Sequence, residues 1–151
     1  MSTDWTTLGE LLPWLRGQAV HLAAAGTEPE LTRTLRAAGF TLARAVVAEP
    51  PAGGERYQPV VVALRLPDSA AGNLDALADS LRDLPLRWPG CDRLALLVAG
   101  ADSLVRGALL SWLQLSLVLG QATATLWQSN GLVLETVFLF PDGTFGVDAP
   151  H

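Results

Sequence analysis

Three aspartates in the stretch GNLDALADSLRDLP are the residues of this chain whose spacing most suggests a function. Asp75, Asp79 and Asp83 lie four residues apart on what the pattern predicts to be one helix. Residues at this spacing share a helix face, where each adjacent pair of like charges costs about 0.2 to 0.5 kcal/mol. Three arrangements would tolerate that repulsion: a solvated helix face, a bound divalent metal ion, or an anionic surface that binds a cationic partner.

A metal ion is the weakest of these interpretations. The first and third aspartates are about two helical turns apart, or ~11 Å, which is too far for one helix to bring their oxygens to a single ion. We therefore expect no metal and no cofactor. The spacing is compatible with both a solvated face and a partner-binding surface, and both stay open at this point.

The other residue types argue against an enzyme. All ten basic residues are arginine, which excludes a P-loop lysine, a Schiff base and a Ser-x-x-Lys nucleophile pair. The imidazoles are limited to His21 and the terminal His151, and His21 lies in an apolar stretch, where we expect a hydrogen-bonded core residue. No serine stands in a nucleophile-elbow motif.

Composition predicts a single domain over residues 1–151. Half of the residues are apolar and only 17% are charged, so much of the chain must be buried in one core or against another chain. The net charge of −5 favours a basic partner and argues against nucleic acid, which binds clustered basic residues. The lone Cys91, expected to be a small buried residue, and an N-terminus without a secretory signal pattern predict a cytoplasmic protein.

The segment between Arg106 and Glu135 contains no charged residue. Its polar residues advance by three, four or seven positions, which predicts a largely buried helix of a soluble protein rather than a membrane span. Because uncharged surface of this length is typical of interfaces, residues 103–128 are also a candidate face for a homodimer. The polar residues are Ser111, Gln114, Gln121, Thr125 and Gln128.

The first third of the chain predicts a strand-helix-strand unit. Residues 18–24 and 40–48 are the predicted strands, and the helix between them begins at a capping box of Thr27 and Glu30 and stops before Gly39. Such a unit implies a parallel pair of strands with a right-handed crossover. Residues 49–59, rich in proline and glycine, are a predicted surface loop. The helix residues expected to face inward are Leu31, Leu35 and Ala38.

The middle of the chain contains one ambiguous segment and one clear helix. Residues 59–66 fit a strand by their β-branched side chains and a short helix by their leading proline, and periodicity does not decide. Asn73 is a predicted N-cap for the aspartate-bearing helix. The predicted buried stripe of that helix consists of Leu74, Leu77, Leu81 and Leu84.

The last third predicts two strands around the uncharged helix. Residues 94–99 are typical of a strand covered on both faces, and residues 132–140 of a final strand with alternating burial, before a turn and tail over 141–151. Asp102 or Ser103 would cap the helix between them, and its predicted end is at 129–131. The whole pattern predicts a small α/β fold with a mainly parallel sheet of three or four strands, flanked by helices.

Residues 72–84, GNLDALADSLRDL, resemble the characteristic motif of the barstar family, N-L-D-A-L-x-D-x-L. Members are small intracellular inhibitors that plug the active site of a basic ribonuclease, and their fold is a three-stranded parallel sheet flanked by helices. The resemblance implies a helix over residues 59–66. It also implies that Asp75 and Asp79 enter the nuclease site where substrate phosphate would lie, with fast, salt-sensitive association. The residues implied in the contact surface are Gly72, Asn73, Asp75, Ala78, Asp79 and Asp83.

The surroundings of the motif depart from the family pattern. Residues 69–71 (SAA) replace aromatic residues that usually precede the helix, Ala78 stands where a tryptophan is common, and Leu84 where another aromatic often follows. Residues 104–128 contain no acid, although this region can add carboxylates to the surface. The chain therefore has two candidate functions. One is inhibition of a basic ribonuclease or related toxin, and the other is a structural or homo-oligomeric interaction module that keeps the fold without inhibiting a nuclease.

Overall fold

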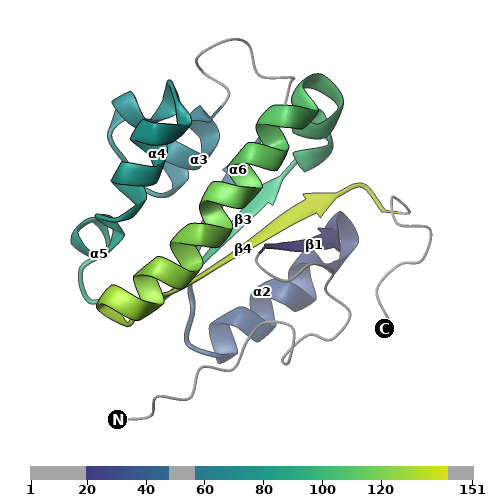
Figure 1. Ribbon diagram of the computed structural model, residues 1–151. Helices are drawn as coiled ribbons and strands as arrows, with labels where there is room; N and C mark the ends of the chain where they lie inside the picture. The colour runs from purple at the N-terminus through teal and green to yellow at the C-terminus, as the bar shows by residue number, and fades with distance from the viewer. Residues whose placement is uncertain (1–19, 48–56, 143–151) are drawn as a thin grey trace.

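Four parallel strands form one sheet with helices on both faces in the computed structural model, which describes residues 20–47 and 57–142 (Figure 1). This confirms the predicted α/β fold. In chain order the elements are β1 (His21–Ala24), η1 (Ala25–Thr27), α2 (Glu28–Ala37), β2 (Thr41–Val46), α3 (Gln58–Ala63), η3 (Asp68–Ala71), α4 (Leu74–Leu81), α5 (Leu84–Arg87), β3 (Arg93–Ala99), α6 (Ala101–Asn130) and β4 (Val133–Phe140).

The strands lie in the order β1-β4-β3-β2, and every neighbouring pair is parallel. The predicted pairing of the first two strands is therefore wrong, because β1 and β2 occupy opposite edges. Burial explains the order: the five inner residues of β3 and all eight residues of β4 are buried, and strands covered on both faces take the central positions of a parallel sheet. In β2, buried residues alternate with exposed ones at its C-terminal half, as suits an edge.

The final strand also differs from its predicted alternation. Both faces of β4 are covered, because one side packs under α6 and the other under α2. Leu134 and Phe138 belong to the core on the α6 side, whereas Val133 and Val137 belong to the core on the α2 side. The apolar character of this strand on both faces is the reason why alternation fails here.

The helices form two layers of unequal size. Helices α3, α4, α5 and α6 cover one face of the sheet, and α2 covers the other (Figure 1). On the α2 side, Leu31 and Leu35 are fully buried, as predicted, and the half-buried Ala38 packs against them. Glu28 also accepts two hydrogen bonds from Arg44 of β2, at 2.6 and 3.1 Å, which raise the pKa of Arg44 above its ordinary value.

The predicted capping box of α2 is wrong. Thr27 has helical backbone angles because η1 runs directly into α2, and its hydroxyl donates to the carbonyl of Ala24 at 2.6 Å instead of capping the helix. An N-cap needs an extended backbone at that residue. The predicted stop is confirmed, since α2 ends at Ala37 and Gly39 has a φ of +90°.

The ambiguous segment is a helix, as the family resemblance implied. Helix α3 begins at Gln58, with Pro59 in its first turn, where a missing N–H costs nothing. The last residues of the predicted loop at 49–59 are therefore helical, and Tyr57 is buried. Residues 48–56 of that loop lie outside the described residues, as does the tail beyond Asp142.

Helix α6 begins and ends at glycines. Gly100, with a φ of +75°, precedes its first residue, so the predicted cap at Asp102 or Ser103 is wrong. Asp102 instead pairs with Arg106 at 2.7 Å. The predicted end is confirmed, because α6 stops at Asn130 and Gly131 has a φ of +70°. The helix is kinked at Ala108, which has a non-helical backbone.

The prediction that the uncharged helix is largely buried is also wrong. Only 28% of its most apolar window of 18 residues is buried, and among the described helices α6 alone has the length and composition to cross a membrane. One face packs on the sheet through Leu115, Leu119 and Leu126. Four of the five predicted polar-face residues are exposed, whereas Ser111 is buried. Four leucines on the outer face of α6 are 49% to 67% exposed: Leu109, Leu110, Leu113 and Leu117.

Candidate partner-binding site

The start of α4 is built as its sequence predicts. Asn73 has an extended backbone, and its Oδ1 accepts a hydrogen bond of 2.7 Å from the N–H of Ala76. This bond satisfies one of the free N–H groups that every helix start leaves, and Asp75 in the first turn faces the positive end of the helix dipole. Gly72 and Asn73 are exposed, so this end of α4 is accessible from outside.

Two of the three aspartates lie on α4, and the third does not. Asp75 and Asp79 are exposed on the helix, but α4 ends at Leu81 and Asp83 precedes the separate helix α5. The prediction of one helix carrying all three is therefore wrong. Pro85 gives the reason, because it has no N–H to donate back to Leu81 and cannot continue α4. Asp83 is exposed as well.

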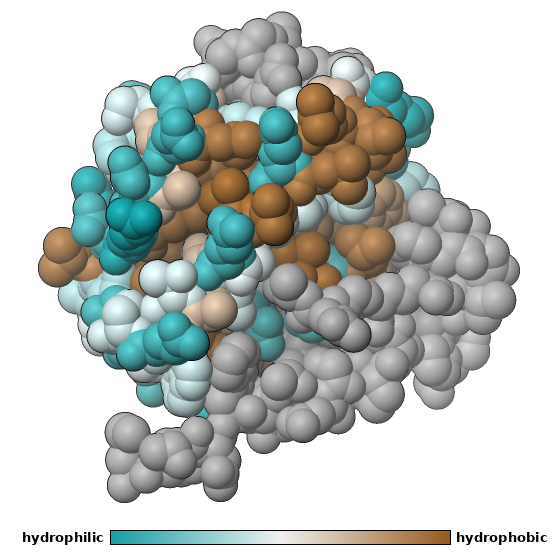
Figure 2. Space-filling view, viewed as in Figure 1, coloured by the Kyte–Doolittle hydropathy of each residue, from teal (hydrophilic) through white to brown (hydrophobic). Residues whose placement is uncertain are grey.

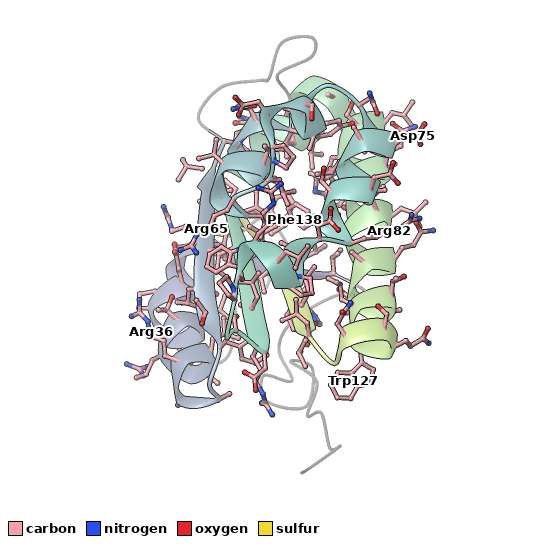
Figure 3. The ribbon with its side chains drawn as sticks, turned by 90° about the vertical axis from the view of Figure 1, so that its left-hand side faces the viewer. Arg36, Arg65, Asp75, Arg82, Trp127 and Phe138 are labelled. Carbon is pink, nitrogen blue, oxygen red and sulfur yellow. The ribbon has the colours of Figure 1, made fainter. Side chains whose placement is uncertain are left out.

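Arg82 places a positive charge beside the aspartates. Its Nη1 lies 3.5 Å from Oδ1 of Asp79, and both side chains are more than two thirds exposed. Figure 3 shows Asp75 and Arg82 on the outer side of α4, while Phe138 lies between the sheet and the helices. Residues 65–87 contain four aspartates and three arginines, so the acidic character comes from their arrangement more than from net charge. The spacing of three residues between Asp79 and Arg82 is the sequence feature that indicates this ion pair.

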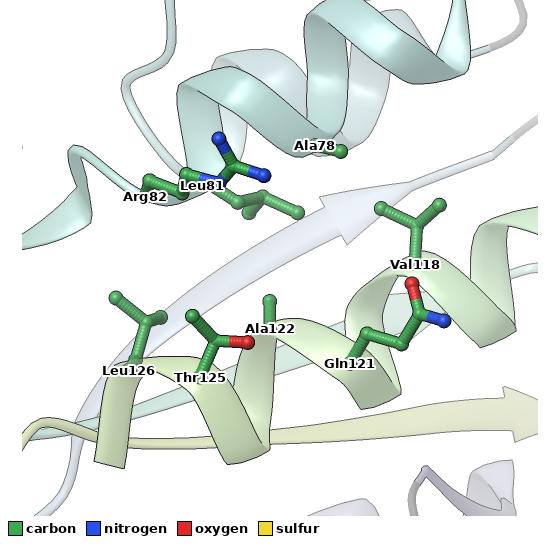
Figure 4. A pocket seen from close by; sticks show the side chains of 8 residues that line it. All are labelled: Ala78, Leu81, Arg82, Val118, Gln121, Ala122, Thr125 and Leu126. Atoms are coloured by element: carbon green, nitrogen blue, oxygen red, sulfur yellow. The ribbon is translucent and has the colours of Figure 1, made fainter. Parts of the chain in front are cut away.

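A groove runs along α4 on the side that faces α6. Ala78 and Leu81 of α4, together with Arg82 directly after it, form one wall, and the turns of α6 over residues 118–126 form the other (Figure 4). The cavity volume is about 90 Å³. Ala78 is half-buried in this wall, so the small side chain at a position where a tryptophan is common opens a hollow in the predicted contact surface. Local spacing does not reveal the groove, because its two walls lie about 40 residues apart in the chain.

A tryptophan in the described core braces the segments around α4. The indole N–H of Trp88 donates to the carbonyl of Leu64 at 2.9 Å, which ties the end of α5 to the end of α3. The guanidinium of Arg65 lies 3.8 Å from the centre of the Trp88 ring, a favourable cation–π contact. Leu84, which was compared with a surface aromatic, is fully buried and belongs to the core.

The remaining chemical candidates lie elsewhere. His21 is buried on β1, with Nε2 3.4 Å from Oε1 of Glu135 on β4. Its Nδ1 has no hydrogen-bond partner among the described residues, so the expectation of a fully hydrogen-bonded core histidine is met at one nitrogen only. Cys91 is half-buried, and its thiol donates to the carbonyl of Arg93 at 3.3 Å. The described residues contain no group of three side chains suited to a metal ion, and His151 lies outside them.

Comparison with known proteins identifies one family. A family model described as Barstar (barnase inhibitor) matches residues 50–138. The match covers α3, α4, α5, β3, α6 and most of β4, whereas β1, α2 and β2 precede it. No curated protein and no solved structure is significantly similar to the chain.

Proposed function

The chain belongs to the barstar family, and on this basis we propose that it binds and blocks a basic ribonuclease or a related nuclease toxin through the exposed face of α4. The observation that carries the proposal is the pair Asp75 and Asp79, exposed on a helix whose start is fixed by Asn73. The helix fixes the backbone positions of both aspartates, so their exposed carboxylates present negative charge at defined places on the surface. They would occupy the positions that substrate phosphates take beside cationic groups of a nuclease.

The proposed action is obstruction, with no bond made or broken by this chain. Opposed charge on the two proteins would raise the association rate, and salt would lower it. We propose a cytoplasmic setting, because the lone Cys91 suits a reducing compartment.

The test is to titrate basic ribonucleases, barnase included, with the full chain. RNA cleavage measures the inhibition, and calorimetry measures the binding. Asp75→Asn/Asp79→Asn removes two charges at nearly constant shape, and we expect it to weaken inhibition at least about 100-fold, since close charge pairs across interfaces dominate affinity. Asp92→Asn is the matched control, because this exposed aspartate lies outside α4, before β3. Equal inhibition by the double variant and the control would refute the proposed role of α4.

A second candidate function has a specific observation in its favour. The leucine ridge, defined as Leu109, Leu110, Leu113 and Leu117, is exposed on α6, and Figure 2 shows hydrophobic side chains gathered over the helix on this face. Contiguous exposed apolar residues of this kind mark interaction sites. We propose self-association through the ridge as the alternative.

Sedimentation separates the two candidates. If the ridge joins two copies, Leu110→Glu/Leu117→Glu will shift a dimer to monomer, while Gln114→Glu adds one charge at a polar exposed position of the same helix as a control. A wild-type chain that stays monomeric at about 100 μM would exclude the ridge as a dimer face.

A further inference from the structure

We propose that the groove between α4 and α6 receives one apolar side chain of the basic partner, next to the carboxylates that hold the partner's cations. This inference rests on the proposed function, namely that α4 is the partner-binding face. It adds a requirement that charge alone does not impose: the partner must present an apolar side chain beside its basic residues.

The lining of the groove favours an apolar occupant. Its walls are built mostly from aliphatic side chains, with Gln121 and Thr125 as the polar members from α6. A volume of about 90 Å³ is well below the roughly 300 to 1,000 Å³ of sites for whole small molecules. The space therefore suits a single side chain. The aliphatic members are Ala78, Leu81, Val118, Ala122 and Leu126.

The groove and the carboxylates lie on adjoining faces of α4. Successive residues of an α-helix are rotated by about 100°, which places Ala78, Arg82, Asp75 and Asp79 in this order around the helix, from the groove outward. A protein that binds both carboxylates therefore lies beside the groove and can reach it with one side chain. Buried apolar anchors surrounded by polar contacts usually carry much of an interface's energy, and α4 itself presents no large apolar side chain outside its buried stripe.

Arg82 favours an occupant of the groove that carries no positive charge. Its side chain lines the groove and also lies 3.5 Å from Asp79, so its guanidinium stands between the hollow and the acidic face. A cationic side chain entering the groove would meet this like charge, whereas an apolar one would not. The partner's cations are thereby directed to Asp75 and Asp79, and its apolar residue to the groove.

The test compares two alanine-to-methionine substitutions in the full chain. Ala78→Met fills the groove from its own wall, whereas Ala124→Met adds the same side chain to an exposed position of α6 that does not line it. Against a ribonuclease that the wild type inhibits, we expect Ala78→Met to weaken binding at least about tenfold and Ala124→Met to change it less than about twofold. Thermal unfolding of both variants checks that they are folded.

A second measurement avoids substitution altogether. Indole, added to the wild-type chain and followed by amide chemical shifts, is expected to perturb Ala78, Val118 and Ala122 and to compete with the ribonuclease. Shifts confined to the leucine ridge would overturn the inference. Ribonuclease binding that needs Asp75 and Asp79 but tolerates both Ala78→Met and indole would overturn the groove and leave the proposed function standing. Failure of every ribonuclease to bind the wild type would overturn both.

Discussion

The charge that α4 offers to a partner depends on single residues, and Arg82 is the clearest case. Its guanidinium lies 3.5 Å from the Asp79 carboxylate, so one of the two aspartates on α4 is partly neutralised before any partner arrives. Sequence alone predicted the exposed aspartates and the Asn73 cap, because both follow from residue type and local spacing. It did not predict the contact of Trp88 with Leu64, which lies 24 residues away.

Replacing Arg82 should strengthen binding of a basic ribonuclease. Arg82→Gln removes the competing cation from Asp79, and we expect a gain of about two- to tenfold, mainly in the association rate measured by stopped flow. Stability should change by less than about 0.5 kcal/mol, because ion pairs this exposed contribute little. Arg87→Gln, at an exposed position on α5, controls for the general loss of positive charge. An equal gain from both variants would contradict a specific role for the Arg82–Asp79 pair.

Removing the cap of α4 should destabilise the fold. Asn73→Ala leaves the N–H of Ala76 without its acceptor at 2.7 Å, and we expect the free energy of unfolding in urea to fall by about 1 kcal/mol. Asn73→Asp keeps an acceptor oxygen at the same place and should lose much less. A similar loss in both variants would mean that the amide stabilises the helix by another contact.

At the scale of elements, local pattern predicted most strands and helices but not their boundaries or neighbours. The break between α4 and α5 follows from Pro85, whose effect is overlooked when only the aspartate spacing is followed. The positions of β1 and β2 at opposite edges depend on which strands are covered on both faces, and this becomes visible only when the whole sheet is assembled. The sequence marked residues 103–128 as a candidate interface but did not single out the four exposed leucines, because a helix with scattered apolar residues has no single obvious buried face.

The junction of β3 and α6 should be intolerant of any side chain. Gly100 has a φ of +75°, and a Cβ there would collide with the backbone carbonyl of Val47. Gly90 offers a matched control, since its φ is +80° and no atom lies within 4 Å of an added Cβ. We expect Gly90→Ala to lower the free energy of unfolding by about 1 to 2 kcal/mol from backbone strain alone, and Gly100→Ala to lower it by clearly more. Equal losses would show that the Val47 backbone moves aside easily.

At the scale of the whole molecule, the sheet separates two cores, and only one of them lies beneath the candidate site. The core on the α3, α4, α5 and α6 side supports the candidate site, whereas the core under α2 lies on the other face. The family match begins at residue 50, so β1, α2 and β2 precede the matched region. Strands β1 and β2 pair with β4 and β3 at the two edges of the sheet, and α2 covers its second face. The resemblance implied three strands, whereas the described sheet has four, with β1 and β2 at its two edges.

This separation predicts that equal losses of stability on the two faces will have unequal effects on binding. Leu35 of α2 and Leu77 of α4 are both fully buried, and each change to alanine should lower the free energy of unfolding by about 2 to 5 kcal/mol. Leu77→Ala weakens the packing of α4, the helix that carries Asp75 and Asp79, against the core. The dissociation constant for an inhibited ribonuclease should therefore rise about tenfold. Leu35→Ala leaves α4 in place and should change it less than about twofold. Calorimetric titration, under conditions where circular dichroism shows both variants folded, would measure this difference, and similar weakening by the two would mean that the sheet transmits the loss from one face to the other.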